Sequence, residues 1–217
     1  MILGGRISLV IGIAAAATAL ILGVLIGLIA GYFRTADALI MRAMDALTPQ
    51  AIGHLLPSLG GFDACVLDAN LREDSLQAAA RIKGMPLVAD PVSAAKCRRL
   101  LPILHRLTAL KPNRLEAEAL TGETAPQNAA AALLARGVRM VFISLGAEGL
   151  YYADAALQGS LRAPSLPPSS RTGAGDAMTA GLALAISQGL PVREAALLGL
   201  EAATRFLSGH GNQVVKR

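Results

Sequence analysis

The chain has 217 residues, of which 53% are hydrophobic, and a formal net charge of +5. Only 3% of the residues are aromatic, none is tryptophan, and the basic residues are scattered, which argues against nucleic-acid binding. The two cysteines, Cys65 and Cys97, fit no metal or redox spacing and favour a reducing, cytosolic setting.

Residues 7–33 contain no charged side chain and are long enough to cross a bilayer as one tilted helix. A cleavable signal peptide is the alternative, but the apolar core is too long for one. Arg34 and Arg42 follow the span, whereas only Arg6 precedes it, so the positive-inside rule places the C-terminal side in the cytoplasm. We therefore expect a chain held in the inner (cytoplasmic) membrane by one span.

From residue 47 the hydrophobic pattern alternates between buried strands and helices, which predicts a doubly wound α/β sheet. The predicted strands are 64–68, 86–90, 107–110, 140–144, 150–153 and 159–163. The predicted helices are 74–82, 94–104, 114–120, 125–136, 174–188 and 191–208. Ligands bind such sheets beyond the carboxyl ends of the strands. Polar residues follow the strands there, so we predict a phosphate and metal site formed by Asp68, Asp90, Asn113 with Glu116, 144–149 and the helix start at Gly173.

A glycine-rich turn leads directly into the helix predicted at 174–188. Gly173 and Gly175 tolerate positive φ and let the backbone approach a bulky ligand. The free N–H groups and the dipole of a helix N-terminus suit phosphate. The same dipole favours an ionised Asp176, which we interpret as a base or a metal-side residue rather than a phosphate ligand. The alternative is that Asp176 caps the helix and the glycines form only a tight turn.

The first 46 residues carry a local resemblance to a transporter. Residues 5–9, 31–33, 37–42 and 44–45 resemble the inner-membrane permease subunit of oligopeptide and dipeptide ABC transporters, although Arg34-Thr35 stands where that family has two glycines. The other membrane helices of the family are absent from the chain. A single helix has no interior to line a pathway, so we expect no transport by this chain alone.

Residues 47–217 resemble a different family. The segments 111–122, 144–149 and 172–176 together resemble the ribokinase/PfkB family of sugar and nucleoside kinases. The segment 90–96, with 68–70 before it, is most similar to the pseudouridine kinase branch. The resemblance implies a ribokinase-like sheet and ATP-dependent phosphoryl transfer to a sugar or nucleoside hydroxyl, with ATP and Mg²⁺ bound. It divides the chain into a membrane span with a permease-like shoulder (1–46) and a kinase-like domain (47–217).

The resemblance also implies roles for the residues of the glycine-rich turn. Asp176 matches the catalytic base, which takes the proton from the acceptor hydroxyl. Gly173, Ala174 and Gly175 match the anion hole, whose N–H groups hold the transferring phosphoryl group. Both roles agree with the properties of a helix N-terminus, because phosphoryl transfer depends on positioning and charge neutralisation.

Other positions match the family's metal and nucleotide sites. Asn113 and Glu116 match the motif that organises Mg²⁺ and phosphate, with Glu116 acting on the metal indirectly. The last helix, near residues 203–209, would border the adenine. The family's nucleotide loop after the fourth predicted strand is matched in this chain by Ser144, Gly146 and Gly149.

The chain departs from the family in two ways. Ser170 stands where the family has Asp or Asn, which puts activation by a monovalent cation in doubt. The N-terminal portion, which supplies the first strands, a β lid and most sugar-binding residues of these kinases, has no counterpart. Three hypotheses follow: a kinase half impaired in acceptor recognition; a non-catalytic fusion or remnant; or a membrane-tethered nucleotide-binding module completed by a partner chain or a homodimer. We expect weak ATP binding at best.

Overall fold

The computed structural model describes residues 48–55, 61–164 and 173–209. The predicted membrane span at 7–33, the permease-like residues 1–46 and Ser170 lie outside these ranges. Within the described ranges, no helix is both long enough and apolar enough to cross a membrane. The membrane span and the domain boundary at residue 46 therefore stay predictions.

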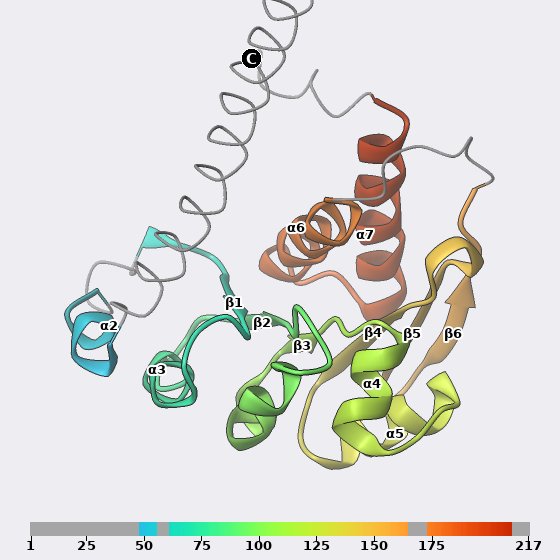
Figure 1. Ribbon diagram of the computed structural model, residues 1–217. Helices are drawn as coiled ribbons and strands as arrows, with labels where there is room; N and C mark the ends of the chain where they lie inside the picture. The colour runs from blue at the N-terminus through green and yellow to red at the C-terminus, as the bar shows by residue number, and fades with distance from the viewer. Residues whose placement is uncertain (1–47, 56–60, 165–172, 210–217) are drawn as a thin grey trace, which may run out of the picture. The chain divides into compact units, whose positions relative to one another are not determined.

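A six-stranded sheet forms the centre of the described chain, and its strand order follows the sequence (Figure 1). The first four strands are parallel, whereas the last two are antiparallel to their neighbours. Only residues 145–149 join the fourth strand to the fifth, and so short a connection can make a hairpin but no parallel crossover. The strands are β1 (Cys65–Asp68), β2 (Leu87–Asp90), β3 (Ala109–Leu110), β4 (Met140–Ser144), β5 (Leu150–Asp154) and β6 (Gln158–Leu161).

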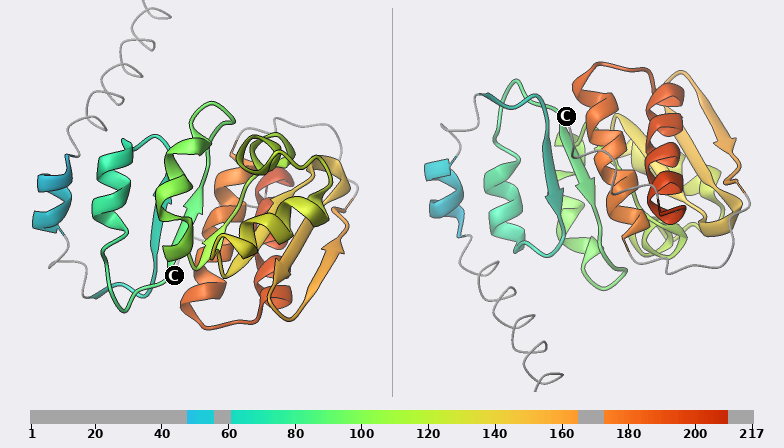
Figure 2. Two further views of the ribbon diagram at one scale, coloured as in Figure 1. Left: turned by 90° about the horizontal axis from the view of Figure 1, so that it is seen from below. Right: turned by 90° about the horizontal axis from the view of Figure 1, so that it is seen from above.

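Helices cover both faces of the sheet, which confirms the predicted α/β class (Figure 2). One face carries α3 (Glu73–Ala79), the 3₁₀ helix η2 (Cys97–Arg106), α4 (Arg114–Thr121) and α5 (Pro126–Ala135). Helix α2 (Pro49–Leu55) packs against α3, beyond the β1 edge of the sheet. The other face carries α6 (Ala174–Ser187) and α7 (Val192–Leu207). A short 3₁₀ turn, η3 (Gly146–Glu148), follows β4.

Two helices differ from the sequence-based expectation. The helix predicted at 94–104 is a 3₁₀ helix from Cys97 to Arg106, and Pro102 lies inside it. Proline has no N–H group to donate to the carbonyl four residues earlier, which disfavours an α-helix there. The seven-residue helix α2 was not predicted, because it is shorter than the window of about 11–18 residues over which helical periodicity is recognised.

Helices α6 and α7 pack closely through two glycines. A Cβ atom on Gly181 would lie 2.8 Å from the carbonyl oxygen of Leu198, and one on Gly199 would lie 2.8 Å from Cγ of Leu182. Leu182 is fully buried in the cluster that joins these helices to the sheet. This packing fixes α6 on the sheet and so determines where its N-terminus lies.

Candidate phosphate-binding site

The N-terminus of α6 has the geometry of an anion site. Gly173 is its N-cap residue, with φ 94°, and no side chain of the described residues caps the helix there. The N–H groups of the first turn therefore have no intrahelical acceptor. Asp176 lies in this first turn, as predicted, and its side chain is exposed. The ring of Phe206, from α7, covers Gly173 so closely that a Cβ there would lie 2.7 Å from Cζ.

The two glycines of the turn serve different purposes. Gly173 needs both its positive φ and its missing side chain, as predicted. Gly175 lies within α6 and is not among the residues with positive φ, so a positive φ occurs in this turn only at Gly173. A Cβ on Gly175 would make an ordinary contact, 3.6 Å from Nζ of Lys111. The helix therefore begins at Ala174, one residue before Gly175, and only Gly173 forms the turn.

A buried ion pair lies beneath this turn, at the carboxyl ends of β2 and β3. Nζ of Lys111 lies 2.9 Å from Oδ2 of Asp90, and the two side chains are only 6% and 15% exposed. The hydroxyl of Thr179, on α6, lies 2.8 Å from the same carboxylate oxygen and 3.0 Å from the carbonyl oxygen of Gly175. The ends of two strands are thus joined to the first turns of α6.

The electrostatics of this arrangement favour a bound anion. A cation is normally disfavoured at a helix N-terminus, because the helix dipole places partial positive charge there. The Lys111 ammonium group nevertheless lies close to the backbone of Gly175, with the carboxylate of Asp90 as its counter-ion. An ammonium group and free N–H groups directed at one place can bind the oxygens of a phosphate group.

Asn113 and Glu116 form a capping box at the start of α4. The Asn113 side chain accepts a hydrogen bond from the Glu116 N–H group at 2.9 Å, and Oε2 of Glu116 accepts one from the Asn113 N–H group at 2.9 Å. Glu116 is only 3% exposed. Burial raises the pKa of Glu116, and the charge of Asp90 raises it further, whereas the Asn113 N–H group and Lys111 lower it.

The donor chemistry of this site fits Mg²⁺ held largely by water and phosphate. The described residues contain no cluster of three or more His, Cys, Asp or Glu side chains suited to a metal. A magnesium ion does not need such a cluster, because it keeps several waters and takes few protein carboxylates when it binds with a nucleotide. Glu116 offers a buried carboxylate whose Oε2 is occupied by the Asn113 N–H group.

We expect Glu116→Gln to stabilise the protein at neutral pH and Glu116→Ala to lack this gain. Glutamine keeps an acceptor for the Asn113 N–H group but carries no buried charge, whereas alanine loses a hydrogen bond that contributes about 1 kcal/mol. Because the pKa of Glu116 is raised in the folded protein, protonation favours folding. The contribution of Glu116 to stability is fully present below its pKa in the unfolded chain. It is lost as the pH rises through the raised pKa of Glu116 in the folded protein.

The measurement is the urea midpoint of unfolding at about pH 4 and at neutral pH. The gain from Glu116→Gln should be present at neutral pH and shrink in acid. Glu118→Gln, at an exposed position on the same helix, is the control and should change little at either pH. A gain that is equal at both pH values would contradict the role assigned to the buried charge.

The predicted nucleotide loop lies beside the capping box. The N–H group of Ser144 donates to the carbonyl of Pro112 at 2.9 Å, and Ser144 forms a parallel bridge with Asn113. Gly146 and Gly149 both have positive φ, at 63° and 111°. At Gly149 a Cβ would also collide with the backbone of the 161–163 segment, so no other residue fits there. The loop and the capping box are therefore neighbours at one edge of the sheet.

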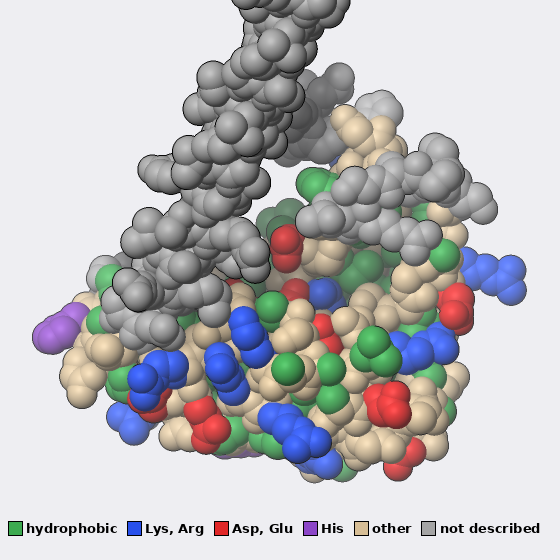
Figure 3. Space-filling model, in the orientation of Figure 1, with side chains coloured by type: hydrophobic (Ala, Val, Ile, Leu, Met, Phe, Trp, Pro, Cys, Tyr) green, Lys and Arg blue, Asp and Glu red, His purple; other side chains and the backbone are tan. Residues whose placement is uncertain are grey.

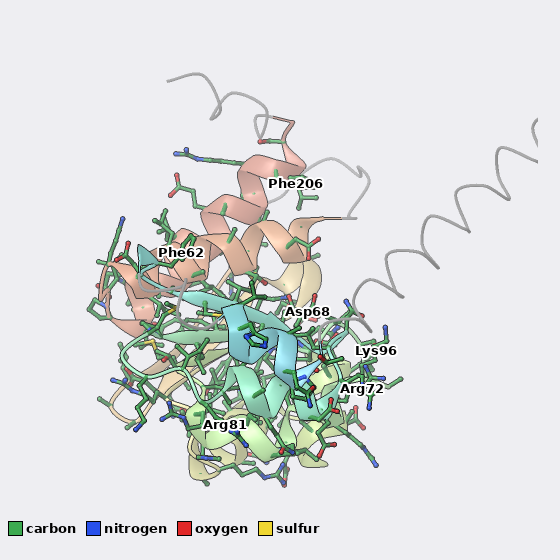
Figure 4. The ribbon with its side chains drawn as sticks, turned by 90° about the vertical axis from the view of Figure 1, so that its left-hand side faces the viewer. Phe62, Asp68, Arg72, Arg81, Lys96 and Phe206 are labelled. Atoms are coloured by element: carbon green, nitrogen blue, oxygen red, sulfur yellow. The ribbon has the colours of Figure 1, made fainter. Side chains whose placement is uncertain are left out.

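A second polar cluster lies at the carboxyl end of β1. Asp68 is level with Asp90 in the sheet and accepts a hydrogen bond from the Asn70 N–H group at 2.8 Å. Nζ of Lys96 donates to Oδ1 of Asn70 at 2.7 Å. Figure 4 shows Asp68 and Lys96 at the same end of the sheet edge, with Arg81 toward the other end. In the space-filling view, acidic and basic side chains are visible together in a recess (Figure 3).

The predicted site residues therefore fall into one region. Nζ of Lys111 lies 3.6 Å from the position that a Cβ on Gly175 would take. Lys111 lies two residues before Asn113, and Asn113 bridges to Ser144. Lys111 and Thr179 were not predicted as site residues, and Asp90 was predicted only as a polar residue at a strand end. A charged residue at the end of an apolar strand was the available signal for Lys111. No sequence signal singled out Thr179.

A separate hollow of about 420 Å³ lies on the face that carries η2, α4 and α5. It shares no residue with the site described above. Its walls are formed by Arg98, Leu101, Leu104, His105, Ala119, Leu120 and Arg136.

Comparison with known proteins places this geometry in a family. The model of the pfkB family carbohydrate kinases matches residues 43–215. The chain belongs to this family. It is 35% identical over 161 residues to the pseudouridine kinase of Escherichia coli, covering 71% of this chain and 51% of that protein. It is 41% identical over 149 residues to a 1-phosphofructokinase of Xanthomonas campestris, covering 61% of this chain and 46% of that protein. The pfkB-family chain thus spans about half the length of the curated relatives it matches.

Solved structures agree with this family and give the fold its name. A carbohydrate kinase from Agrobacterium tumefaciens matches with a TM-score of 0.65 and 31% identity, over 75% of this chain and 54% of that one. A ribokinase from Thermotoga maritima matches with a TM-score of 0.64 and 25% identity, over 70% of this chain and 52% of that one. The described chain of this pfkB-family protein therefore has the ribokinase-like fold, as predicted.

Proposed function

We propose that this chain carries out ATP-dependent phosphoryl transfer to a hydroxyl group of a sugar or nucleoside, with pseudouridine as the first acceptor to test. The observation that carries the proposal is the convergence of an uncapped helix N-terminus, an exposed Asp176 and the Lys111 ammonium group at one edge of the sheet. The similarity to the pseudouridine kinase of Escherichia coli supports the choice of acceptor.

In the proposed reaction Asp176 accepts the proton of the acceptor hydroxyl. The acceptor oxygen then bonds to the γ-phosphorus, and the bond from that phosphorus to the bridging oxygen breaks, releasing ADP. The N–H groups of Gly173, Ala174 and Gly175 stabilise the charge on the transferring group. Lys111 adds a positive charge beside the same group.

The remaining proposed roles concern the nucleotide and the metal. Ser144, Gly146 and Gly149 would hold the nucleotide, and the end of α7 would border the adenine. Bound Mg²⁺ would neutralise phosphate charge, with Glu116 holding one of its waters. No role for a monovalent cation is proposed.

A non-catalytic remnant, or a membrane-tethered nucleotide-binding module, is the second candidate. The chain spans about half of the length of the relatives that it matches, so similarity alone does not carry their whole activity over to it. Acceptor binding could then be lost or be supplied by a partner chain. The two candidates differ in whether bound ATP is ever turned over.

Calorimetry and product analysis on the full-length chain test the proposal. The chain would be titrated with ATP in the presence and absence of Mg²⁺, in detergent if its predicted span requires it. We expect Mg²⁺-dependent binding with a dissociation constant on the order of 1 mM, and formation of ADP when pseudouridine is added. Binding without ADP formation would favour the tethered module. No detectable binding would reject the kinase proposal in favour of the remnant.

A further inference from the structure

The Asp90 carboxylate accepts hydrogen bonds from three separate segments. Oδ1 accepts from the Val92 N–H group at 3.0 Å. Oδ2 accepts from Nζ of Lys111 at 2.9 Å and from the Thr179 hydroxyl at 2.8 Å. Val92 itself has φ 65°, a strained conformation for a β-branched residue. Asp90 therefore joins its own turn to the end of β3 and to α6.

Thr179 contributes more than a helical threonine usually does. The hydroxyl of Thr121, on α4, donates only to the carbonyl four residues earlier, at 2.7 Å, and accepts from the Glu123 N–H group. The Thr179 hydroxyl reaches the equivalent carbonyl, that of Gly175, at 3.0 Å, but it also reaches Asp90 across 89 residues of sequence. Its single proton is shared between a charged and a neutral acceptor, and the charged acceptor makes the stronger bond.

This arrangement allows Lys111 to change partner. A buried carboxylate that lost its only counter-ion would be strongly destabilised. Asp90 would still accept hydrogen bonds from Val92 and Thr179 if the ammonium group turned toward an anion at the start of α6. The ammonium group lies 3.6 Å from the position of a Cβ on Gly175, in the first turn of α6, so the lysine side chain has only a short distance to move.

We propose that Thr179 and Asp90 are positioning residues for Lys111. In the free protein they hold its ammonium group beside the first turn of α6. When a phosphate oxygen arrives, Thr179 keeps Asp90 in place while Lys111 pairs with the anion. The identification of that anion as a phosphate of ATP rests on the proposed function, whereas the positioning itself does not.

Calorimetry with ATP and Mg²⁺ on the full-length chain is the first test. Thr179→Val removes the hydroxyl at nearly constant volume and should raise the dissociation constant about tenfold, since a hydrogen bond to a charged group is lost. Thr179→Ser keeps the hydroxyl and should remain within about twofold of the wild type. Thr121→Val removes a similar back-bond on the opposite face of the sheet and is the matched control. Equal affinity in Thr179→Val and the wild type would overturn the proposal.

Nuclear magnetic resonance of ¹⁵N-lysine-labelled chain is the second test and needs no ATP. A buried, ion-paired ammonium group gives its own signal, which Lys111→Met would identify by its loss. We expect this signal to shift or broaden in Thr179→Val but not in Thr121→Val, and to move in the wild type when inorganic phosphate is added. An unchanged signal in Thr179→Val would overturn the positioning role. A wild-type chain that binds no ATP would reject the proposed function, and this second test would then decide the positioning role alone.

Discussion

Asp176→Asn is expected to abolish phosphoryl transfer to pseudouridine, lowering kcat by about 10²–10⁴-fold, the usual contribution of a general base. Asparagine has nearly the shape of aspartate but cannot take the proton of the acceptor hydroxyl. The Asp176 side chain is exposed in the first turn of α6, so its replacement should leave the fold intact. Affinity for ATP should be unchanged or tighter, because a negative charge beside the phosphates is removed. ADP release measured by a coupled assay gives kcat, and calorimetry gives the affinity.

Glu194→Gln is the matched control for this substitution. Glu194 is likewise an exposed acidic residue in the first turn of a helix, α7, and it has no part in the proposed site. It should leave kcat and the affinity for ATP unchanged. Undiminished turnover in Asp176→Asn would refute the assignment of the base, whereas equal losses in both variants would point to a general effect of acidic residues at helix N-termini.

Asp90→Ala is expected to destabilise the protein by about 3–5 kcal/mol, the cost of leaving a buried charge without its partner. Lys111 is only 5% exposed, and Asp90 is its ion-pair partner in the described chain. Lys111→Met should cost less, because Asp90 keeps its hydrogen bonds from Val92 and Thr179. The two halves of one ion pair are thus predicted to differ in their effect on stability.

Urea unfolding followed by circular dichroism measures this difference. The double variant Asp90→Ala/Lys111→Met removes both charges and should recover much of the stability lost in Asp90→Ala, since no unpaired charge remains buried. Equal losses in the two single variants would contradict the asymmetry. A double variant no more stable than Asp90→Ala would show that packing, rather than charge, governs this position.

The position of α6 illustrates how far local sequence signals reached. The helix was predicted at 174–188 and is observed at Ala174–Ser187, because the apolar residues that follow the turn recur at helical spacing. Strand β4 was predicted with its observed ends, Met140 and Ser144. The capping-box residues Asn113 and Glu116 are only three residues apart, so their spacing was also visible in the sequence. The position of Asp176 in the first turn of α6 could be predicted from the sequence for the same reason.

Other features depended on contacts between distant segments. The φ of Gly175 depends on where α6 begins relative to Gly173, which is held against Phe206 from the following helix.

By itself, the sequence determined the α/β class, most of the strands and helices, and the residues at the ends of the strands, because hydrophobic periodicity and turn residues act over a few neighbouring positions. The tertiary structure alone decided that Lys111, Asp90 and Thr179 meet beneath the turn at Gly173. Thr179 reaches Asp90 across 89 residues. A contact of that kind forms only when α6 packs on the sheet, and no local pattern encodes it.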